Sequence, residues 1–459
     1  MNPILNHRPT ATLTHPLTKL IATVAVATSA VASELRVPEN YPTIQAAVDA
    51  AGTNDVIQIA PGVYPAQVQV ISKKLTLVGR PGTILRATPS LPVVPEGTVA
   101  HIPILYLRDS DVVVRGLIFE GERLAGRAPG SDELRGILSR GCNLEVEDCA
   151  FYGFRDTPTG SESATPLVAT SERVVQVRVA GCTFADGQSA LFCVGASSER
   201  SMDISIENNT ILGLGPVNRG LNTAAIHIGE GVSGRISGNT ISGFSYTGTG
   251  IEFPICYGIL LSNQANDPEF GIAGPLIIEG NTFRDNQMHI SLTKANGSLV
   301  RNNRFQGTAP GILPLGLAIS GTNVTIANNQ FENLPEGIRL IGQHPLQDPL
   351  PDLGDALGFA FDAQIISNRF CNVTTPINRQ VLATATETGT QLGACDSPPL
   401  SITPSVVLSW PTVAGLWSVE SAPQLGGPWT PSTASPTPEG ERQMLVVPAE
   451  RAHHFFRLR

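Results

Sequence analysis

One short pattern recurs along this chain and limits what the chain can fold into. A strand with alternating side chains is followed by an asparagine, which stands two residues before a large apolar anchor, as in the segment from Thr325 to Phe331. The shortest interval between anchors is about 22 residues, the length of one solenoid turn. A unit this short cannot bury its own apolar face, so its copies must stack. The anchors are Phe119, Phe151, Phe184, Ile211, Ile241, Phe283, Phe305, Phe331 and Phe370.

The repeats have the periodicity of strands and not of helices, because apolar residues alternate with polar ones and Val, Ile and Thr are frequent. This predicts an all-β fold, a single-stranded parallel β-solenoid. The recurrent asparagines should then form one vertical file, with rungs roughly 4.8 Å apart. We expect each of them to occupy a left-handed turn and to bond to the copies above and below, as architecture and not as ligand sites. They are Asn209, Asn239, Asn281, Asn303, Asn329 and Asn368, and Cys149 and Cys182 hold the same place in earlier copies.

The N-terminal segment has the features of an export signal. An apolar run from Leu20 to Ala32 follows basic residues and ends in a small-x-small cleavage pattern. This predicts a signal peptide over residues 1–32 and a secreted protein, extracellular or periplasmic, although an anchoring or disordered tail is the alternative. Thr43 and Gly52 then delimit a short amphipathic helix, which we expect to cap the open first rung.

Charge and composition restrict the partners. The formal net charge is −9 and no basic cluster occurs, so nucleic acid is not an expected partner. The same acidity gives no general attraction for polyanionic sugars. No stretch after the signal is long and apolar enough to insert into a membrane, and we expect a monomer. Cys371 and Cys395 bracket the end of the last clear rung, where a disulfide is one of two open possibilities.

The opening of the mature chain resembles a known family. The order YPTIQAAVDAA, DVIQIAPGVY and KKLTLVGR over residues 41–80 is similar to that of right-handed parallel β-helix proteins of the pectin-lyase-like superfamily. The resemblance implies a right-handed β-helix over residues 35–396. It implies no single activity, because this opening precedes lyases, hydrolases, epimerases and proteins without known chemistry. The motifs that mark polygalacturonases, alginate epimerases and pectate lyases in that superfamily do not occur here.

The last part of the chain differs in composition. Residues 400–459 hold all three tryptophans and end in the sequence FFRLR. They resemble the small fibronectin-type-III-like modules that end many secreted bacterial proteins, which implies a compact antiparallel β module. We expect the tryptophans to form its core, with stacking on sugars as the alternative.

A second strand follows each anchor, and its middle residue should point outward. The predicted outward column contains one candidate base, His227, with Glu230 in the next turn and Arg219 in the preceding loop. An ordinary histidine on a sheet face is the alternative interpretation. Asp348, Asp352 and Asp355 could bind calcium, but a solvated insertion is the favoured interpretation because their spacing matches no known calcium loop. The column is Leu138, Phe192, His227, Leu260, Ser291, Ala318 and Arg339.

Two functions therefore remain open. The first is a secreted β-helix that binds or processes polysaccharide, with no cofactor except a possible calcium ion. The second is a noncatalytic extracellular or cell-surface scaffold, attached through the C-terminal module. A groove that gathers charged residues on one face favours the first, and a flat face lined by Leu138, Phe192 and Leu260 favours a binding or structural role.

Overall fold

The chain forms two compact units in the computed structural model, Met1–Gly393 and Ala394–Arg459. The structure describes residues 32–96, 99–121, 133–154, 164–187, 189–195, 197–217, 223–246, 256–262, 274–307, 314–342, 359–393, 405–411, 419–422, 429–431, 437–439, 442–448 and 455–458.

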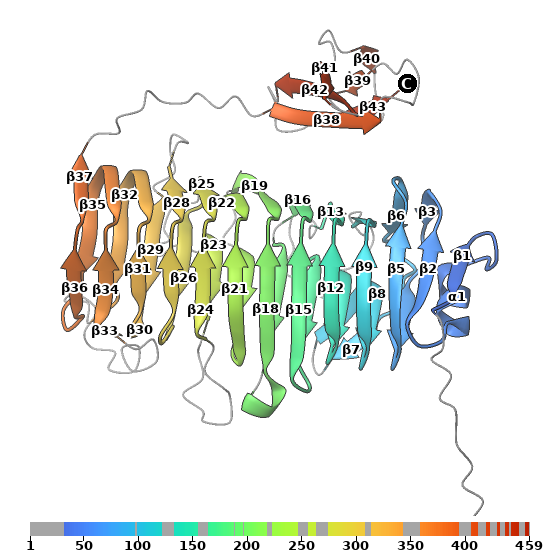
Figure 1. Ribbon diagram of the computed structural model, residues 1–459, viewed down its shortest axis with the longest axis horizontal. Coiled ribbons are helices and arrows are strands. Elements are labelled where there is room, and N and C mark those ends of the chain that lie inside the picture. The colour runs from blue at the N-terminus through green and yellow to red at the C-terminus, as the bar shows by residue number, and fades with distance from the viewer. Residues whose placement is uncertain are drawn as a thin grey trace, which may run out of the picture. The chain divides into compact units, whose positions relative to one another are not determined.

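The first unit is a parallel β-helix, in which equivalent strands of successive turns lie side by side (Figure 1). One face is a 13-stranded sheet whose neighbouring strands all pair in parallel. In order these strands are β1 (Glu34–Val37), β2 (Asp55–Ile59), β5 (Lys74–Gly79), β9 (Asp111–Arg115), β12 (Asn143–Glu147), β15 (Val175–Ala180), β18 (Met202–Glu207), β21 (Val232–Ser237), β24 (Leu276–Glu279), β27 (Leu299–Arg301), β31 (Thr325–Ala327), β34 (Ala363–Ile366) and β36 (Ala385–Thr388).

Most of the remaining strands of the first unit belong to a 22-stranded sheet. Two others, β30 (Gly321–Thr322) and β33 (Ala360–Phe361), form a separate two-stranded sheet. The members of the large sheet are β3 (Gly62–Tyr64), β4 (Val68–Ile71), β6 (Thr83–Arg86), β7 (Val94–Glu96), β8 (Val99–Arg108), β10 (Ile118–Glu120), β11 (Glu133–Arg140), β13 (Ala150–Tyr152), β14 (Leu167–Thr170), β16 (Thr183–Gly187), β17 (Leu191–Val194), β19 (Thr210–Val217), β20 (Thr223–Ile228), β22 (Thr240–Tyr246), β23 (Cys256–Leu261), β25 (Thr282–Arg284), β26 (Met288–Leu292), β28 (Arg304–Gln306), β29 (Leu315–Ile319), β32 (Gln330–Leu340), β35 (Arg369–Arg379) and β37 (Gln391–Gly393).

Helical structure is sparse among the described residues. Helix α1 (Ile44–Ala50) begins after Thr43, whose side chain accepts a hydrogen bond from the Ala46 N–H. The helix contacts β1, β2 and β4, and it lies at the β1 end of the solenoid (Figure 1). A single 3-10 turn, η1 (Ser198–Arg200), precedes β18. None of the described helices has the length and apolar character needed to cross a membrane.

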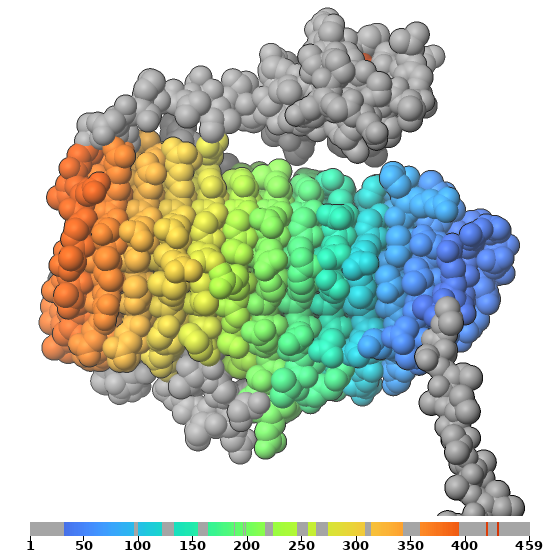
Figure 2. Space-filling view, in the orientation of Figure 1, coloured from blue at the N-terminus to red at the C-terminus, as the bar shows by residue number. Residues whose placement is uncertain are grey.

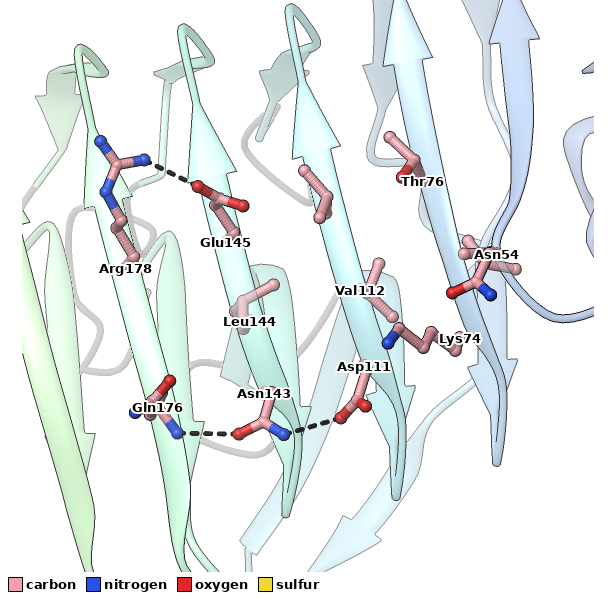
Figure 3. A pocket seen from close by; sticks show the side chains of 12 residues that line it. Asn54, Lys74, Thr76, Asp111, Val112, Asn143, Leu144, Glu145, Gln176 and Arg178 are labelled. Carbon is pink, nitrogen blue, oxygen red and sulfur yellow. Dashed lines mark hydrogen bonds and ion pairs between the residues drawn. The ribbon is translucent and has the colours of Figure 1, made fainter. Parts of the chain in front are cut away.

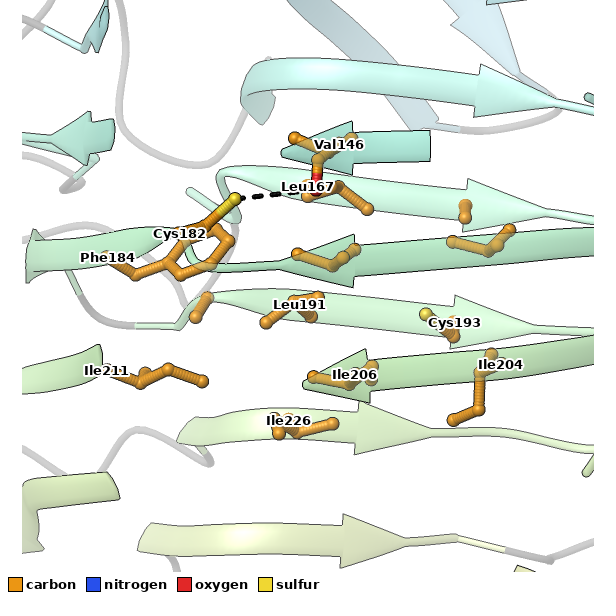
Figure 4. Close-up of a cluster of buried hydrophobic side chains, with 14 of the residues drawn as sticks. Val146, Leu167, Cys182, Phe184, Leu191, Cys193, Ile204, Ile206, Ile211 and Ile226 are labelled. Atoms are coloured by element: carbon orange, nitrogen blue, oxygen red, sulfur yellow. Dashed lines mark hydrogen bonds between the residues drawn. The ribbon is translucent and has the colours of Figure 1, made fainter. Parts of the chain in front are cut away.

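The core runs along the axis of the first unit and is built from stacked anchors. Phe283, Phe305, Phe331 and Phe370 stack with ring centroids 5.1, 4.7 and 4.9 Å apart. The same arrangement joins the three earlier phenylalanine anchors, and aliphatic side chains from neighbouring strands fill the space between (Figure 4). On the solvent side, successive turns form parallel bands along the unit (Figure 2). The predicted stacking of the repeats is confirmed.

The asparagines form a single buried file beside this core. From Asn239 onward, each side-chain oxygen accepts hydrogen bonds from the backbone N–H and the amide of the asparagine one turn earlier, as Asn239 does for Asn209 at 2.9 Å each. Cys182 extends the file, because its backbone N–H donates to Asn209 Oδ1 over 2.9 Å. The ladder prediction is confirmed, with one correction to the backbone. The left-handed residue is the one before the ladder position, such as Asn208 with φ 55° and Asn302 with φ 55°.

The second unit contains six described strands in two antiparallel sheets. One sheet is ordered β38 (Ser405–Pro411), β42 (Arg442–Pro448), β41 (Thr437–Glu439), and the other is ordered β40 (Thr430–Pro431), β39 (Val419–Ala422), β43 (Phe455–Leu458). The resemblance of this unit to a fibronectin-like module stays a prediction.

Candidate functional site

A hollow of about 370 Å³ opens on the outer face of the 13-stranded sheet, over strands β5, β9, β12 and β15 (Figure 3). Its shape follows from the pleat, because alternate residues of each strand point away from the core. Along β9, half-buried and buried residues alternate: Asp111 and Val113 are half-buried, and Val112 and Val114 are buried. Each strand therefore presents the hollow with residues from two outward positions.

The first outward row is entirely polar. Lys74 pairs in register with Asp111, and Asp111 pairs with Asn143 on the next strand. The Asn143 amide continues the row, because its Nδ2 donates to Asp111 Oδ1 over 2.8 Å and its Oδ1 accepts the Gln176 backbone N–H over 2.9 Å. Asn143 is thus fixed in place by both neighbours. The row crosses four strands of the sheet without an apolar member.

The second outward row is mixed. Thr76, Val113, Glu145 and Arg178 pair in register across the same four strands. Arg178 Nη1 donates to Glu145 Oε1 over 2.8 Å and also donates to Glu147 Oε1. The hydrogen bond to Glu147 is the main cause that raises the pKa of Arg178. The positive charge of Arg178 is therefore already compensated by carboxylates.

Several polar groups at the hollow remain free to bind a ligand. The side chains of Asn54, Lys74, Thr76 and Gln176 make no hydrogen bond to the described part of the chain. Asn54, Lys74 and Gln176 are also exposed. The hollow therefore offers two amides, a hydroxyl and an ammonium group, which together can donate and accept hydrogen bonds. A ligand rich in hydroxyl groups matches this set.

Sequence reasoning missed this hollow because it considered only the column that contains His227. The signal was present in the strands themselves. Lys74, Asp111, Asn143 and Gln176 each stand one residue before a buried apolar position of a strand. A comparison of these four strands, position by position, would have revealed a polar row.

The predicted outward column around His227 does exist in the register of the large sheet. Phe192 pairs with His227, His227 with Leu260, and Leu260 with Ser291. The prediction omitted one turn, because Val168 of β14 lies between Leu138 and Phe192. Ala318 and Arg339 then continue the column, as expected.

Part of this column is not available to a ligand. Leu138 has no exposed surface, and it packs with Tyr106 and Val168 in a second apolar cluster that is separate from the axial core. Val94 of β7 packs against the same cluster. A flat apolar face, which would favour a binding or structural role, cannot include Leu138, because another segment already covers that side chain.

His227 lies in a desolvated position beside this cluster. Its Nε2 is 2.6 Å from Ser262 Oγ, and its ring centroid is 4.7 Å from that of Phe192. Burial lowers the pKa of His227 to about 4, and the negative charge of Glu230 offsets this only in part. The imidazole is therefore neutral at pH 7 and only weakly basic.

The other predicted candidates are not brought into a site that the structure describes. Arg219, Asp348, Asp352 and Asp355 lie outside the described residues. Among the residues that are described, no group of three or more His, Cys, Asp and Glu side chains is placed to hold a metal ion. The calcium site stays a prediction.

Two further residues, His289 and Cys371, have clear positions in the structure. His289 is fully buried in the axial core, where its ring centroid is 6.0 Å from that of Phe283 and 5.8 Å from that of Phe305. It therefore cannot act on a solvent-borne ligand. Cys371 is disulfide-bonded, and its expected partner, Cys395, lies outside the described residues.

A comparison with protein families agrees with the fold. The family model "Right handed beta helix region" matches residues 177–347, so the β-helix is right-handed. No curated protein sequence matches the chain significantly. Similar solved structures include the PL6 family alginate lyase AlyGC, with 16% identity over 74% of this chain and a TM-score of 0.43. This chain covers only 44% of that lyase.

Two other structures have the same level of similarity. The periplasmic alginate epimerase AlgG has 12% identity and a TM-score of 0.41, with 74% of this chain and 77% of the epimerase covered. DFA-IIIase from Arthrobacter chlorophenolicus A6 has 16% identity and a TM-score of 0.40, with 80% and 85% covered. The activities of these enzymes are not transferred to this chain by likeness at this level.

Proposed function

We propose that this β-helix binds polysaccharide in the hollow over β5, β9, β12 and β15, outside the cytoplasm. The observation that carries the proposal is the polar row of Lys74, Asp111, Asn143 and Gln176 on four successive strands, beside side chains that have no partner of their own. An extended sugar chain presents hydroxyl groups at regular intervals, and a row of this kind can meet them at regular intervals.

The proposal is for binding and not for catalysis. General acid–base catalysis is most efficient when the pKa of the group is near the working pH. The pKa of His227, about 4, is well below neutrality, and its Nε2 is already 2.6 Å from Ser262 Oγ. The predicted roles of His227, Glu230 and Arg219 in catalysis therefore receive no support from the geometry of the described residues.

Affinity electrophoresis of the full chain tests the proposal. The protein is run in native gels that contain a panel of soluble neutral and acidic polysaccharides, and retardation measures binding. The double variant Thr76→Val/Gln176→Ala removes two side chains that make no hydrogen bond within the described residues, so the fold is retained. We expect it to bind about tenfold more weakly, because each lost hydrogen bond costs roughly 0.5–1.5 kcal/mol.

Gln364→Ala is the matched control. Gln364 is also an exposed glutamine on the outer face of the same sheet, but it belongs to β34 and does not line the hollow. Its replacement is expected to leave retardation unchanged. If no polysaccharide retards the unmodified protein, or if both variants weaken binding equally, the hollow is not a binding site and the scaffold function is favoured.

A further inference from the structure

We propose that the hollow selects an uncharged glycan chain, which runs across the strands with about one sugar unit for each strand. This inference rests on the proposed polysaccharide binding and adds the class of ligand. It separates this chain from proteins that recognise polyuronates, because the ion pairs at the hollow leave a single lining cation free, among the described residues, to meet an anionic chain.

The direction of the bound chain follows from the register. The polar row runs from Lys74 to Gln176 across strands β5, β9, β12 and β15 (Figure 3). Neighbouring strands are about 4.8 Å apart, so the row is about 14 Å long. The length that one hexopyranose unit adds to an extended chain is similar to this spacing between neighbouring strands. Successive sugars can therefore meet equivalent positions on successive strands.

Two arginines at the hollow are compensated within the protein. Arg178 binds Glu145 at 2.8 Å, and Arg173 Nη2 is 3.3 Å from Asp111 Oδ1. Among the side chains that line the hollow, Lys74 is the one cation without an ion-pair partner in the described residues. A uronate chain carries one carboxylate on every unit. It would therefore find one free cation over four strands.

The negative charges at the hollow are held in the same ion pairs as the arginines. Asp111 of β9 and Glu145 of β12 both line the hollow, one in each row, and they pair with Arg173 and Arg178. Each pair is close to neutral, so a uronate carboxylate above either strand would lose water without gaining a free cation. A neutral sugar avoids this cost, and its hydroxyl groups can donate to the same carboxylates.

The remaining lining suits a neutral sugar. Asn54, Thr76 and Gln176 supply uncharged donors and acceptors, and Val113 supplies an apolar surface between Thr76 and Glu145. Sugar rings combine hydroxyl edges with apolar C–H faces, so a mixed lining of this kind contacts both. Recognition would then depend little on salt, since screening affects interactions between charges.

Isothermal titration calorimetry of the full chain tests this selectivity. The probes are a neutral β-linked gluco-oligosaccharide and a uronate oligosaccharide of equal length, each measured at low and high salt. We expect the uronate to bind at least about tenfold more weakly, because most of its carboxylates would lose water without a free cation to meet them. Between about 20 and 300 mM salt, the affinity for the neutral chain should change by less than about twofold.

The variant Asp111→Asn makes the test specific to the hollow. It removes one negative charge but keeps a side-chain oxygen that can accept from Asn143 Nδ2, and it releases Arg173. We expect the ratio of uronate to neutral affinity to rise about tenfold. The control is Glu387→Gln on β36, far along the same sheet from the hollow. The Glu387 carboxylate is also paired with an arginine, since it lies 2.7 Å from Arg379. It should leave the ratio unchanged.

The outcomes separate this inference from the function on which it rests. If the uronate binds as tightly as the neutral chain, with steep salt dependence, the charge argument is wrong while polysaccharide binding stands. An unchanged affinity ratio in Asp111→Asn also overturns the inference. If neither oligosaccharide binds, the proposed function itself fails.

Discussion

Asn281 donates two hydrogen bonds to the same oxygen, Asn303 Oδ1, one from its backbone N–H over 2.9 Å and one from its side-chain amide over 3.0 Å. The second amide hydrogen of Asn281 reaches the carbonyl of Ile236 over 2.9 Å. Each asparagine thus connects its own turn to the turns on both sides. Because these groups are buried, every turn depends on its neighbours for hydrogen bonds that water cannot replace.

Replacement of one ladder asparagine should therefore destabilise the whole first unit. Asn281→Leu leaves the backbone N–H and the amide of Asn239 without their acceptor. Each buried unsatisfied group costs about 1–3 kcal/mol, so we expect a loss of about 2–5 kcal/mol in the free energy of unfolding. Equilibrium urea denaturation measures it.

Asn281→Cys is the matched variant, because cysteine already occupies the ladder position at Cys149 and Cys182. The Cys182 thiol is 3.6 Å from the Val146 carbonyl, which parallels the contact between Asn209 and the Val179 carbonyl. We expect Asn281→Cys to lose clearly less stability than Asn281→Leu. Equal losses in the two variants would show that a thiol at this position replaces none of the hydrogen bonds of the amide.

Gly234 is required by a close approach between strands. Its φ is +130°, and a Cβ atom at this position would lie 2.1 Å from the carbonyl oxygen of Ile204 on the neighbouring strand. Gly234→Ala should therefore separate β18 from β21 and cost about 2–4 kcal/mol of stability. Thermal unfolding followed by circular dichroism checks this. Gly393→Ala, where a Cβ has no neighbour within 4 Å, should leave the melting temperature unchanged.

The buried His289 predicts a specific pH dependence of stability. Burial lowers the pKa of His289 to about 3 in the folded protein, from about 6.5 when the chain is unfolded. The neutral imidazole therefore contributes stability that is fully present above pH 6.5 and is lost as the pH falls towards 3. In this range the free energy of unfolding should fall by about 1.4 kcal/mol per pH unit from this residue alone.

His289→Gln removes this titration and keeps an oxygen that can accept from Asn286 Nδ2, which now lies 3.2 Å from His289 Nδ1. Denaturant unfolding at a series of pH values compares the two proteins. The variant should show a shallower loss of stability between pH 6.5 and 3. Parallel curves for the two proteins would contradict the assignment of the neutral imidazole to this site.

The free cysteines should be unreactive in the folded protein. Five described cysteines are free and buried, and burial raises the pKa of Cys193 to about 12. The thiolate is the reactive form, so ionisation opposes modification of Cys193, and burial denies the reagent access to all five. We expect Ellman's reagent to detect no thiol under native conditions and about five after unfolding in guanidinium chloride. Rapid labelling of the native protein would contradict the burial of these side chains.

Local periodicity in the sequence was sufficient to predict the stacked turns, the phenylalanine stack and the asparagine file. A period of two fixes the strand, and a repeated anchor fixes which residue faces the core, so the copies can only stack. The turn at β14 was missed because its strand follows a Pro- and Ser-containing insertion and so has no fixed distance from Phe151. The left-handed position was assigned one residue late, since either asparagine of an Asn-Asn pair can adopt that conformation.

Only the tertiary structure decided which outward residues become a site. Whether an outward side chain is covered depends on segments distant in sequence, such as β7, which packs on the cluster that contains Leu138. The hollow arises because Lys74, Asp111, Asn143 and Gln176 come from four different turns and meet through the register between strands. Register across a sheet is a property of pairs of strands. Because the loops between successive turns differ in length, the spacing of residues along the sequence does not reveal this register. The sequence therefore determined the solenoid and its inner face, while the charges and free groups of the outer face acquired their arrangement only when the turns stacked.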